Sequence, residues 1–183
     1  MLRIEAGGTP SIDVRGRDKK YKWLTPQQAI EAWFDLLEVS TSPERTLHLK
    51  RMILQGTAFL DPDKVEGLFG IRVVERKEAR PEGEDCFSYT FGSQVDIGRF
   101  HDNLFANSQE SDVPVSGAYA VYFEYFKRVP VHIGRVTKQG TVISRWGPTA
   151  HVYEHEPDLA PLSYGEPRFF LLVYLYTSGV DSP

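Results

Sequence analysis

Cysteine is nearly absent from this chain, because Cys86 is the only one among 183 residues. A single cysteine cannot form an intramolecular disulfide, and it excludes a zinc site built from several cysteines. The simplest account is a protein that works in a reducing compartment. The one thiol is then either a small core residue or a reactive group, and its sequence neighbours have to distinguish the two.

Long apolar runs are also absent. The longest, Phe169–Tyr176, is far too short to cross a bilayer and predicts a strand. The first ten residues, MLRIEAGGTP, lack the apolar core of a signal peptide. We therefore expect a cytoplasmic protein with no membrane partner. Secretion by a route that needs no signal peptide is compatible with the same sequence.

The charge balance gives no sign of a nucleic-acid binder. The net charge is −4, the pI is near 5.7, and the most basic stretch, Arg15–Lys22, is short. Hydrophobic residues make up 41% of the chain and aromatic residues 13%, which is enough for a packed core. We expect one domain, or one domain with a small appendage.

The first part of the chain predicts a loose arm followed by a small helical subdomain. Residues 1–22 contain Gly, Pro and charges without periodicity, so we expect the arm there. Residues 23–76 contain two clear helix starts. Thr25-Pro26-Gln27-Gln28 combines an N-cap, a proline at the first helical position and a capping box, and Ser42-Pro43-Glu44 repeats the start signal.

The rest of this subdomain has weaker signals. The second helix is expected to end near Gly56. A third, short helix is expected to begin at Asp61-Pro62-Asp63, and Ile71–Val74 is expected to be a short strand.

After a polar connector at Lys77–Glu84, residues 85–183 change in character. Asp85–Phe91 predicts a short helix capped by Asp85, whereas Gly92–Gly117 and Pro148–Pro167 predict mostly loop. Strands are expected at Tyr119–Phe126, Val131–Thr137, Thr141–Arg145 and Phe169–Tyr176, with a glycine turn at Lys138–Gly140. The predicted fold class is therefore α+β, with a cysteine-bearing helix followed by an antiparallel sheet.

Cys86 and His132 form the pair that carries chemistry. A thiolate, not a thiol, is the nucleophile, and a helix N-terminus and an imidazolium both lower a thiol pKa. Cys86 follows the cap residue Asp85, so its backbone N–H would also help to hold an oxyanion. The carboxylates of Asp85 and Glu84 would oppose thiolate formation if they face the sulfur. His132 lies on a predicted strand, where it could accept the thiol proton.

The same two residues have a plain structural interpretation. A lone cysteine is usually a small buried core residue, and a histidine on a strand is usually structural. Composition and spacing therefore leave a catalytic pair and a packed pair both open.

The segment around Cys86, Asp85–Gly92, resembles the nucleophile helix of the NlpC-type, papain-like cysteine peptidase superfamily. The later segments Val131–Val136 and Gly140–Ser144 are similar to its histidine strand and the hairpin that follows. The resemblance covers about Asp85 to Phe170. It implies a papain-like half with a nucleophile helix on an antiparallel sheet, and a peptidase or amidase that cleaves peptide, cell-wall amide, acyl or glutamine-amide substrates.

The third catalytic position departs from that family. The resemblance implies a His, Asn, Glu or Gln that orients the base, but Ser144 occupies the place here. Strand alternation favours the same sheet face for Ser144 and His132. Ser144 is therefore the predicted orienting residue, with His155, Glu154 and His151 as the alternatives.

The stretch His151-Val152-Tyr153-Glu154-His155 also matches H-x-x-E-H, an inverted zinc-peptidase motif. On a helix the two histidines would share a face and bind zinc, with the glutamate as base. Pro148 and Pro157 leave at most two helical turns, so we expect no metal and no cofactor.

The sequence therefore predicts a cysteine hydrolase with Cys86 as nucleophile, His132 as base and Ser144 as orienting residue. The expected partner is a peptide or amide-containing substrate, including a protein, and no nucleic acid. An intracellular hydrolase and a bacterial effector or toxin both fit. The alternative from another class is a catalytically degenerate papain-like fold that serves as a protein-interaction module. A zinc-dependent hydrolase through His151, Glu154 and His155 is the third.

Overall fold

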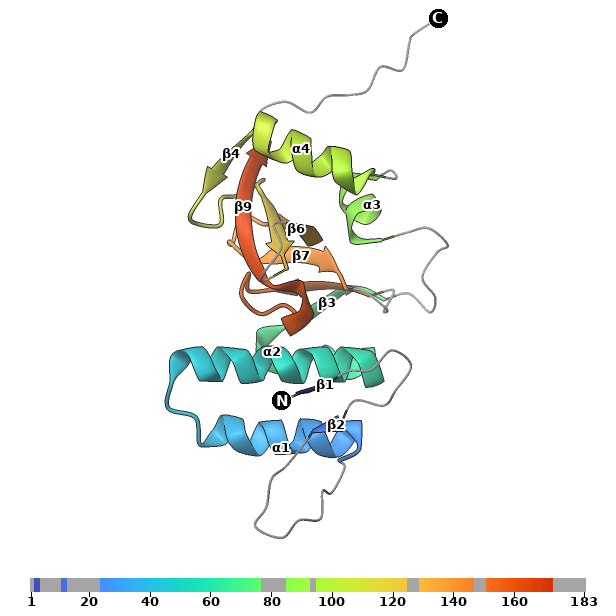
Figure 1. The fold of residues 1–183 in the computed structure, drawn as a ribbon, viewed down its shortest axis with the longest axis vertical. Coiled ribbons are helices and arrows are strands. Elements are labelled where there is room, and N and C mark those ends of the chain that lie inside the picture. Colours follow the sequence, from blue (N-terminus) through green and yellow to red (C-terminus); the bar gives the residue numbers. More distant parts are fainter. Residues whose placement is uncertain are drawn as a thin grey trace, which may run out of the picture. The chain divides into compact units, whose positions relative to one another are not determined.

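The computed structural model describes residues 2–3, 11–12, 24–76, 85–92, 95–124, 129–146 and 151–172. The chain divides into two compact units (Figure 1). The helical unit comprises Met1–Gly70 together with Leu159–Leu162, and the sheet unit comprises Ile71–Asp158 and Ser163–Pro183.

In the helical unit, both predicted helix starts are confirmed. Helix α1 spans Pro26–Glu38 and α2 spans Pro43–Leu60. The Thr25 hydroxyl accepts the Gln28 N–H at 3.2 Å, and the Gln28 side chain accepts the Thr25 N–H at 3.0 Å, which completes the capping box. Ser42 caps α2 through the Arg45 N–H at 3.4 Å. These caps are local, so the sequence was sufficient to predict them.

The predicted end of the second helix at Gly56 is wrong, because α2 continues to Leu60. A Cβ added at Gly56 would lie 3.0 Å from the Ile30 side chain and 3.1 Å from that of Trp33. The glycine thus allows close packing of α1 on α2 instead of ending the helix. The predicted third helix consists of two 3₁₀ turns, Pro62–Val65 and Leu68–Gly70.

The predicted loose arm contains a short antiparallel pair, β1 (Leu2–Arg3) with β2 (Ser11–Ile12). The other residues of the arm lie outside the described ranges. No helix among the described residues is long and apolar enough to cross a membrane.

The sheet unit is built on seven antiparallel strands in the order β3-β8-β7-β6-β5-β9-β4. The strands are β3 (Arg72–Glu75), β4 (Ser108–Ser111), β5 (Tyr119–Phe123), β6 (Pro130–Val136), β7 (Val142–Arg145), β8 (Val152–His155) and β9 (Glu166–Leu172). Two helices, α3 (Cys86–Phe91) and α4 (Ile97–Asn107), belong to the unit, and so do the last two residues of a 3₁₀ turn, η3 (Leu162–Tyr164). The predicted α+β class with an antiparallel sheet is confirmed.

Two predicted loops contain regular structure. The stretch Gly92–Gly117 contains α4 and β4, because Asp96 caps α4 by accepting the N–H groups of Gly98 and Arg99 at 2.9 and 3.2 Å. Phe100 and Leu104 then lie one turn apart and are buried. The stretch Pro148–Pro167 contains β8, which pairs with β7 and β3. Its residues 147–150 lie outside the described ranges.

The boundary predicted at residue 76 also moves. β3 was expected in the helical subdomain, but it pairs with β8 at the edge of the sheet, and the units separate after Gly70. Within the helical unit, the buried Arg51 Nε donates to the carbonyl oxygen of Ala160 at 3.1 Å. The predicted connector Lys77–Glu84 and residues 173–176 of the predicted last strand lie outside the described ranges.

The main apolar cluster of the sheet unit lies between α3, α4 and one face of the sheet. It consists of Phe87, Phe100, Leu104, Val121, Phe123, Ile133 and Phe170, with Cys86 and Phe91 partly buried against it. Figure 1 shows α3 and α4 next to each other, and the ring of Phe100 contacts those of Phe87 and Phe91 at 5.4 Å. We call this side of the sheet the helix face.

Candidate functional site

Cys86 is the first residue of α3, as predicted. Asp85 is the N-cap: its carboxylate accepts the Ser88 N–H at 2.7 Å, and the Ser88 hydroxyl accepts the Asp85 N–H at 2.7 Å. This reciprocal box fixes the start of a helix of only six residues. The cysteine side chain is half-buried.

The surroundings of the thiol favour its neutral form. Burial, the largest cause, and the nearby carboxylate of Asp85 raise the pKa of Cys86 to about 11. The nearby backbone N–H groups of Ile133, Cys86 and Phe87 act in the opposite direction but are weaker in sum. The lowered thiol pKa that a helix N-terminus would give is therefore absent. At neutral pH the group is a thiol.

The sulfur lies near Ile133 of β6, next to the end of the β6–β7 ladder. We call this end of the ladder, at Ile133 and Gly134, the fork. On β6, Val136 N–H donates toward β5, to Ala118 O at 2.9 Å. Since N–H directions alternate along a strand, Ile133 N–H points away from β5, toward β7. The β6–β7 ladder, however, contains only the pairs Arg135–Ile143 and Val136–Val142. The Ile133 N–H near the thiol is therefore one without a ladder partner on β7 among the described residues.

Gly134 allows β7 to lie very close to β6 next to the fork. A Cβ at this position would lie 2.4 Å from Val142 Cγ1, 2.8 Å from the carbonyl oxygen of Ile143 and 2.8 Å from Ser144 Cβ. Only a residue without a side chain lets β7 cross so close to β6 before the strands separate.

His132 lies on the opposite side of the sheet from the helix face. It is 1% exposed, and its ring contacts those of Tyr122 and Tyr164. Burial, the main cause, and the charge of nearby His155 hold the pKa of His132 well below its usual value. Its Nε2 atom is buried without a hydrogen-bond partner among the described residues. We call this second side of the sheet the histidine face.

Ser144 and His155 form a separate buried chain on the histidine face. The Ser144 hydroxyl lies 3.0 Å from His155 Nε2 and accepts the Trp146 indole N–H at 3.1 Å. His155 Nδ1 lies 2.7 Å from the carbonyl oxygen of Glu156, so Nδ1 carries the proton and Nε2 accepts from Ser144. Burial lowers the pKa of His155 to about 4, and the imidazole is neutral.

This chain changes the role predicted for Ser144. Ser144 and His132 do lie on the same face, but no hydrogen bond joins them within the described residues, and the serine hydroxyl is committed to His155. Strand alternation alone could not distinguish these two histidines, because β8 was not predicted.

Cys86 and His132 approach the fork from different sides. α3 packs on β6 and β7 from the helix face, whereas the His132 side chain projects from the histidine face. No hydrogen bond joins the thiol to the imidazole in the described part of the chain. The sulfur lies near the backbone N–H of Ile133, the residue directly after His132.

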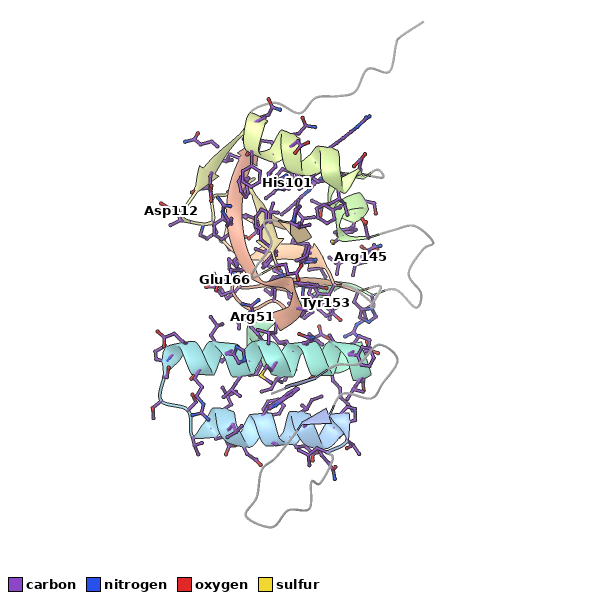
Figure 2. All side chains as sticks on the ribbon, in the orientation of Figure 1. Arg51, His101, Asp112, Arg145, Tyr153 and Glu166 are labelled. Atoms are coloured by element: carbon purple, nitrogen blue, oxygen red, sulfur yellow. The ribbon has the colours of Figure 1, made fainter. Side chains whose placement is uncertain are left out.

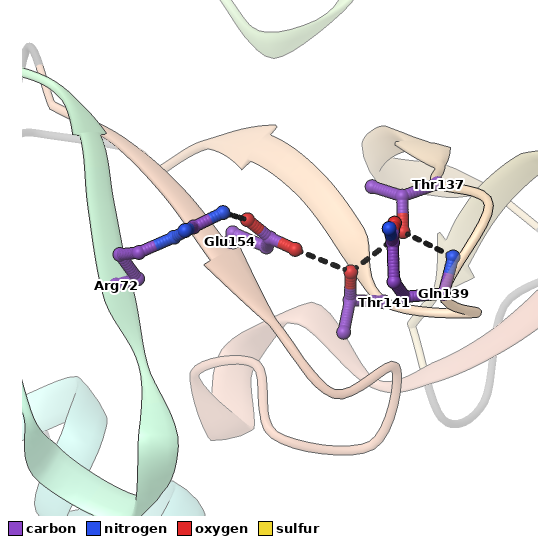
Figure 3. Close-up of polar contacts among 5 residues, drawn as sticks. All are labelled: Arg72, Thr137, Gln139, Thr141 and Glu154. Atoms are coloured by element: carbon purple, nitrogen blue, oxygen red, sulfur yellow. Dashed lines mark hydrogen bonds and ion pairs between the residues drawn. The ribbon is translucent and has the colours of Figure 1, made fainter.

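Glu154 does not lie beside His132 but bonds to Arg72 and Thr141. It pairs with Arg72 of β3 and accepts the Thr141 hydroxyl at 2.7 Å, and Thr141 contacts Thr137 at 2.7 Å (Figure 3). The hydrogen bond from Thr141, and then that from Arg72, lower the pKa of Glu154. This chain joins β3, β8 and the β6–β7 turn.

The H-x-x-E-H motif does not form the helix that zinc binding through it requires. Glu154 and His155 lie on strand β8 and therefore point to opposite faces. His151 precedes the strand, and its carbonyl oxygen accepts the Trp146 N–H at 3.4 Å. Among the described residues, no three His, Cys, Asp or Glu side chains are grouped to hold a metal ion.

The aromatic neighbours of His132 were hardly predictable from the sequence. Tyr122 lies within a predicted strand, and Tyr164 and Gly165 lie within a stretch predicted to be mostly loop. Arg145 and Tyr153, labelled in Figure 2, lie on adjacent strands and point to opposite faces of the sheet. Arg145 lies over the Tyr89 ring of α3 at 4.6 Å, and Tyr153 contacts Trp146 at 4.4 Å. A glycine directly after a tyrosine was the one available signal of a close backbone approach.

Comparison of the chain with protein-family models, curated proteins and solved structures finds no match in any of the three.

Proposed function

We propose that this protein is a cysteine hydrolase of papain-like arrangement, with Cys86 as nucleophile and His132 as base. The observation that carries the proposal is the fork. The Cys86 thiol lies near the backbone N–H of Ile133, and the preceding residue, His132, has a buried Nε2 without a hydrogen-bond partner among the described residues. A buried polar atom without a partner is costly, so its retention favours a ligand or a reaction step that uses it.

The reaction would act on an amide or ester carbonyl. The Cys86 proton moves to His132 Nε2 as the sulfur bonds to the carbonyl carbon, and the Cys86 backbone N–H helps to hold the oxyanion. His132 then gives the proton to the leaving amine or alcohol as its bond to carbon breaks. Water hydrolyses the thioester in the reverse sense, releasing the acid and restoring the thiol. Neither a metal nor a cofactor is needed.

Both groups start neutral in this scheme. The thiol pKa is raised and the imidazole pKa is lowered, so an ion pair is not the resting state. Proton transfer would instead accompany attack, as in general-base catalysis. A bound substrate would have to bring sulfur and Nε2 together at the fork.

Acylation by a p-nitrophenyl ester tests the proposal. We expect mass spectrometry to find one acyl group on Cys86, and His132→Ala to slow acylation by about 10²-fold or more. His101→Ala is the matched control, because His101 lies on α4 of the same unit and contacts Asp102 and Phe105 instead of the fork. Acylation that is no faster than that of an unstructured cysteine and indifferent to His132→Ala would refute the proposal.

That negative result would support the second candidate, a catalytically inactive domain of the same fold that binds a protein partner. The raised pKa of the Cys86 thiol favours it, because a neutral half-buried thiol packs as an ordinary small side chain.

A further inference from the structure

Tyr164 lies almost flat against His132. The two ring centroids are 4.0 Å apart and the ring planes differ by 8°. Tyr122 completes the group, with its ring 5.3 Å from His132 and 6.4 Å from Tyr164. All three residues belong to the sheet unit.

The backbone fixes Tyr164 in this place. The next residue, Gly165, has φ +77°, and a Cβ there would lie 1.8 Å from the carbonyl oxygen of Phe123. Only glycine permits this approach to β5. β9 begins immediately afterwards, with Glu166 paired to Phe123. The chain on both sides of the stacked tyrosine is thus held against β5.

Tyr122 is anchored independently. Its hydroxyl donates to the carbonyl oxygen of Pro157 at 2.9 Å, and its backbone pairs with His132 in the β5–β6 ladder. Two tyrosines from different elements therefore restrict the imidazole.

Among the described residues, no polar side chain hydrogen-bonds to the His132 ring to restrict it. Ser144, the predicted orienting residue, is bonded to His155 and Trp146, and His132 Nε2 has no partner among the described residues. The parallel stack leaves the edge of the imidazole, and with it Nε2, free for a proton. When the ring is protonated, the electron-rich face of tyrosine stabilises the cation.

We propose that Tyr164 is the positioning residue for His132, and that ring stacking replaces the hydrogen bond by which a third catalytic residue orients the base. This inference rests on the proposed function, because it assumes that His132 accepts the Cys86 proton.

The variants Tyr164→Phe and Tyr164→Leu test the stack. Phenylalanine keeps the ring and leucine removes it. We expect Tyr164→Phe to keep the wild-type rate of Cys86 acylation, and Tyr164→Leu to slow it at pH 7 by roughly 10²-fold, as misplaced catalytic groups do. The difference should narrow as the pH approaches the thiol pKa of about 11, because the thiolate then forms without a base. Tyr119→Leu, which removes a tyrosine ring that packs at a tilt 5.1 Å from that of Phe91, is the control for general loss of packing.

Proton NMR gives a readout that does not depend on catalysis. The His132 Hε1 resonance should carry an upfield ring-current shift in the wild type and in Tyr164→Phe, and lose it in Tyr164→Leu. Absence of the shift in the wild type would overturn the inference even if the leucine variant does not fold.

The combined results separate the two proposals. If His132→Ala slows acylation but Tyr164→Leu does not, the positioning role is wrong and the hydrolase stands. If Tyr164→Leu abolishes the ring-current shift but acylation ignores His132→Ala, Tyr164 orients the ring and the hydrolase is wrong.

Discussion

The two faces of the seven-stranded sheet have opposite chemistry. The helix face is an apolar core of phenylalanine and aliphatic side chains under α3 and α4, with the Cys86 thiol at its margin. The histidine face buries His132, His155 and Ser144 among aromatic rings. The apolar cluster on the helix face excludes water, whereas on the histidine face the buried Ser144 and His155 side chains hydrogen-bond to each other.

The contrast teaches that the candidate nucleophile and base cannot be assigned to one face. Strand alternation separates them, and the β6–β7 ladder contains only the pairs Arg135–Ile143 and Val136–Val142. A catalytic site formed by Cys86 and His132 would therefore depend on where the β6–β7 ladder ends.

The largest effect should come from the helix face. Phe87 is 2% exposed, and Phe87→Ala should lower the free energy of unfolding by about 3–5 kcal/mol, because it leaves a cavity among well-packed rings. Urea denaturation measures the change. Val113→Ala, at a position 60% exposed in the same unit, should remain within about 0.5 kcal/mol. Equal losses for both variants would contradict the assignment of the core to this face.

The histidine face should make stability depend on pH. His155 has its pKa lowered from 6.5 to about 4 in the folded protein, so the unfolded chain binds more protons between these values. Stability should therefore fall as the pH drops from 6.5 toward 4. The fall should be on the order of 2 kcal/mol from His155 alone between pH 7 and 5, and His132 acts in the same direction.

Urea denaturation of His155→Gln at pH 7 and pH 5 checks this origin. The variant should show a smaller loss between the two pH values than the wild type, whereas Ser116→Ala, at an exposed position, should keep the wild-type loss. An unchanged pH dependence in His155→Gln would mean that His155 is not buried in its neutral form.

Removing the hydroxyl that joins the chain on the histidine face should have a somewhat smaller effect. Ser144→Ala leaves His155 Nε2 and the Trp146 indole N–H buried without partners, which should cost about 1–3 kcal/mol in unfolding free energy. Ser116→Ala, at an exposed position, is the matched control. If the loss does not exceed that of the control, the Ser144 hydrogen bonds contribute nothing to this face.

The smallest effect should come from the rim of the sheet. Arg168 pairs with Glu110, and the two side chains are 39% and 42% exposed. Glu110→Gln should therefore change the unfolding free energy by less than about 1 kcal/mol, and the difference should shrink in high salt. A larger, salt-independent effect would show that the pair is part of the buried structure.

Much of the fold was predictable because its signals are local. The N-caps Thr25, Ser42 and Asp85 act over three residues, and the Gly140 turn acts over four. α4 was missed because its buried positions Phe100 and Leu104 are separated by polar and charged residues typical of loops. β8 was missed because only pairing with β3 and β7 makes its short segment a strand.

The sequence by itself determined the position of the thiol in the secondary structure, at the first residue of a short helix. Asp85 caps a helix whose first residue is Cys86, and His132 lies on a strand, because capping and strand alternation depend on near neighbours. Only the tertiary structure decided what surrounds these groups. Burial raises the thiol pKa, Ser144 bonds to His155, and Tyr164 stacks on His132. Burial, hydrogen bonding across strands and ring stacking all join residues far apart in the chain, and residue spacing carries no record of them.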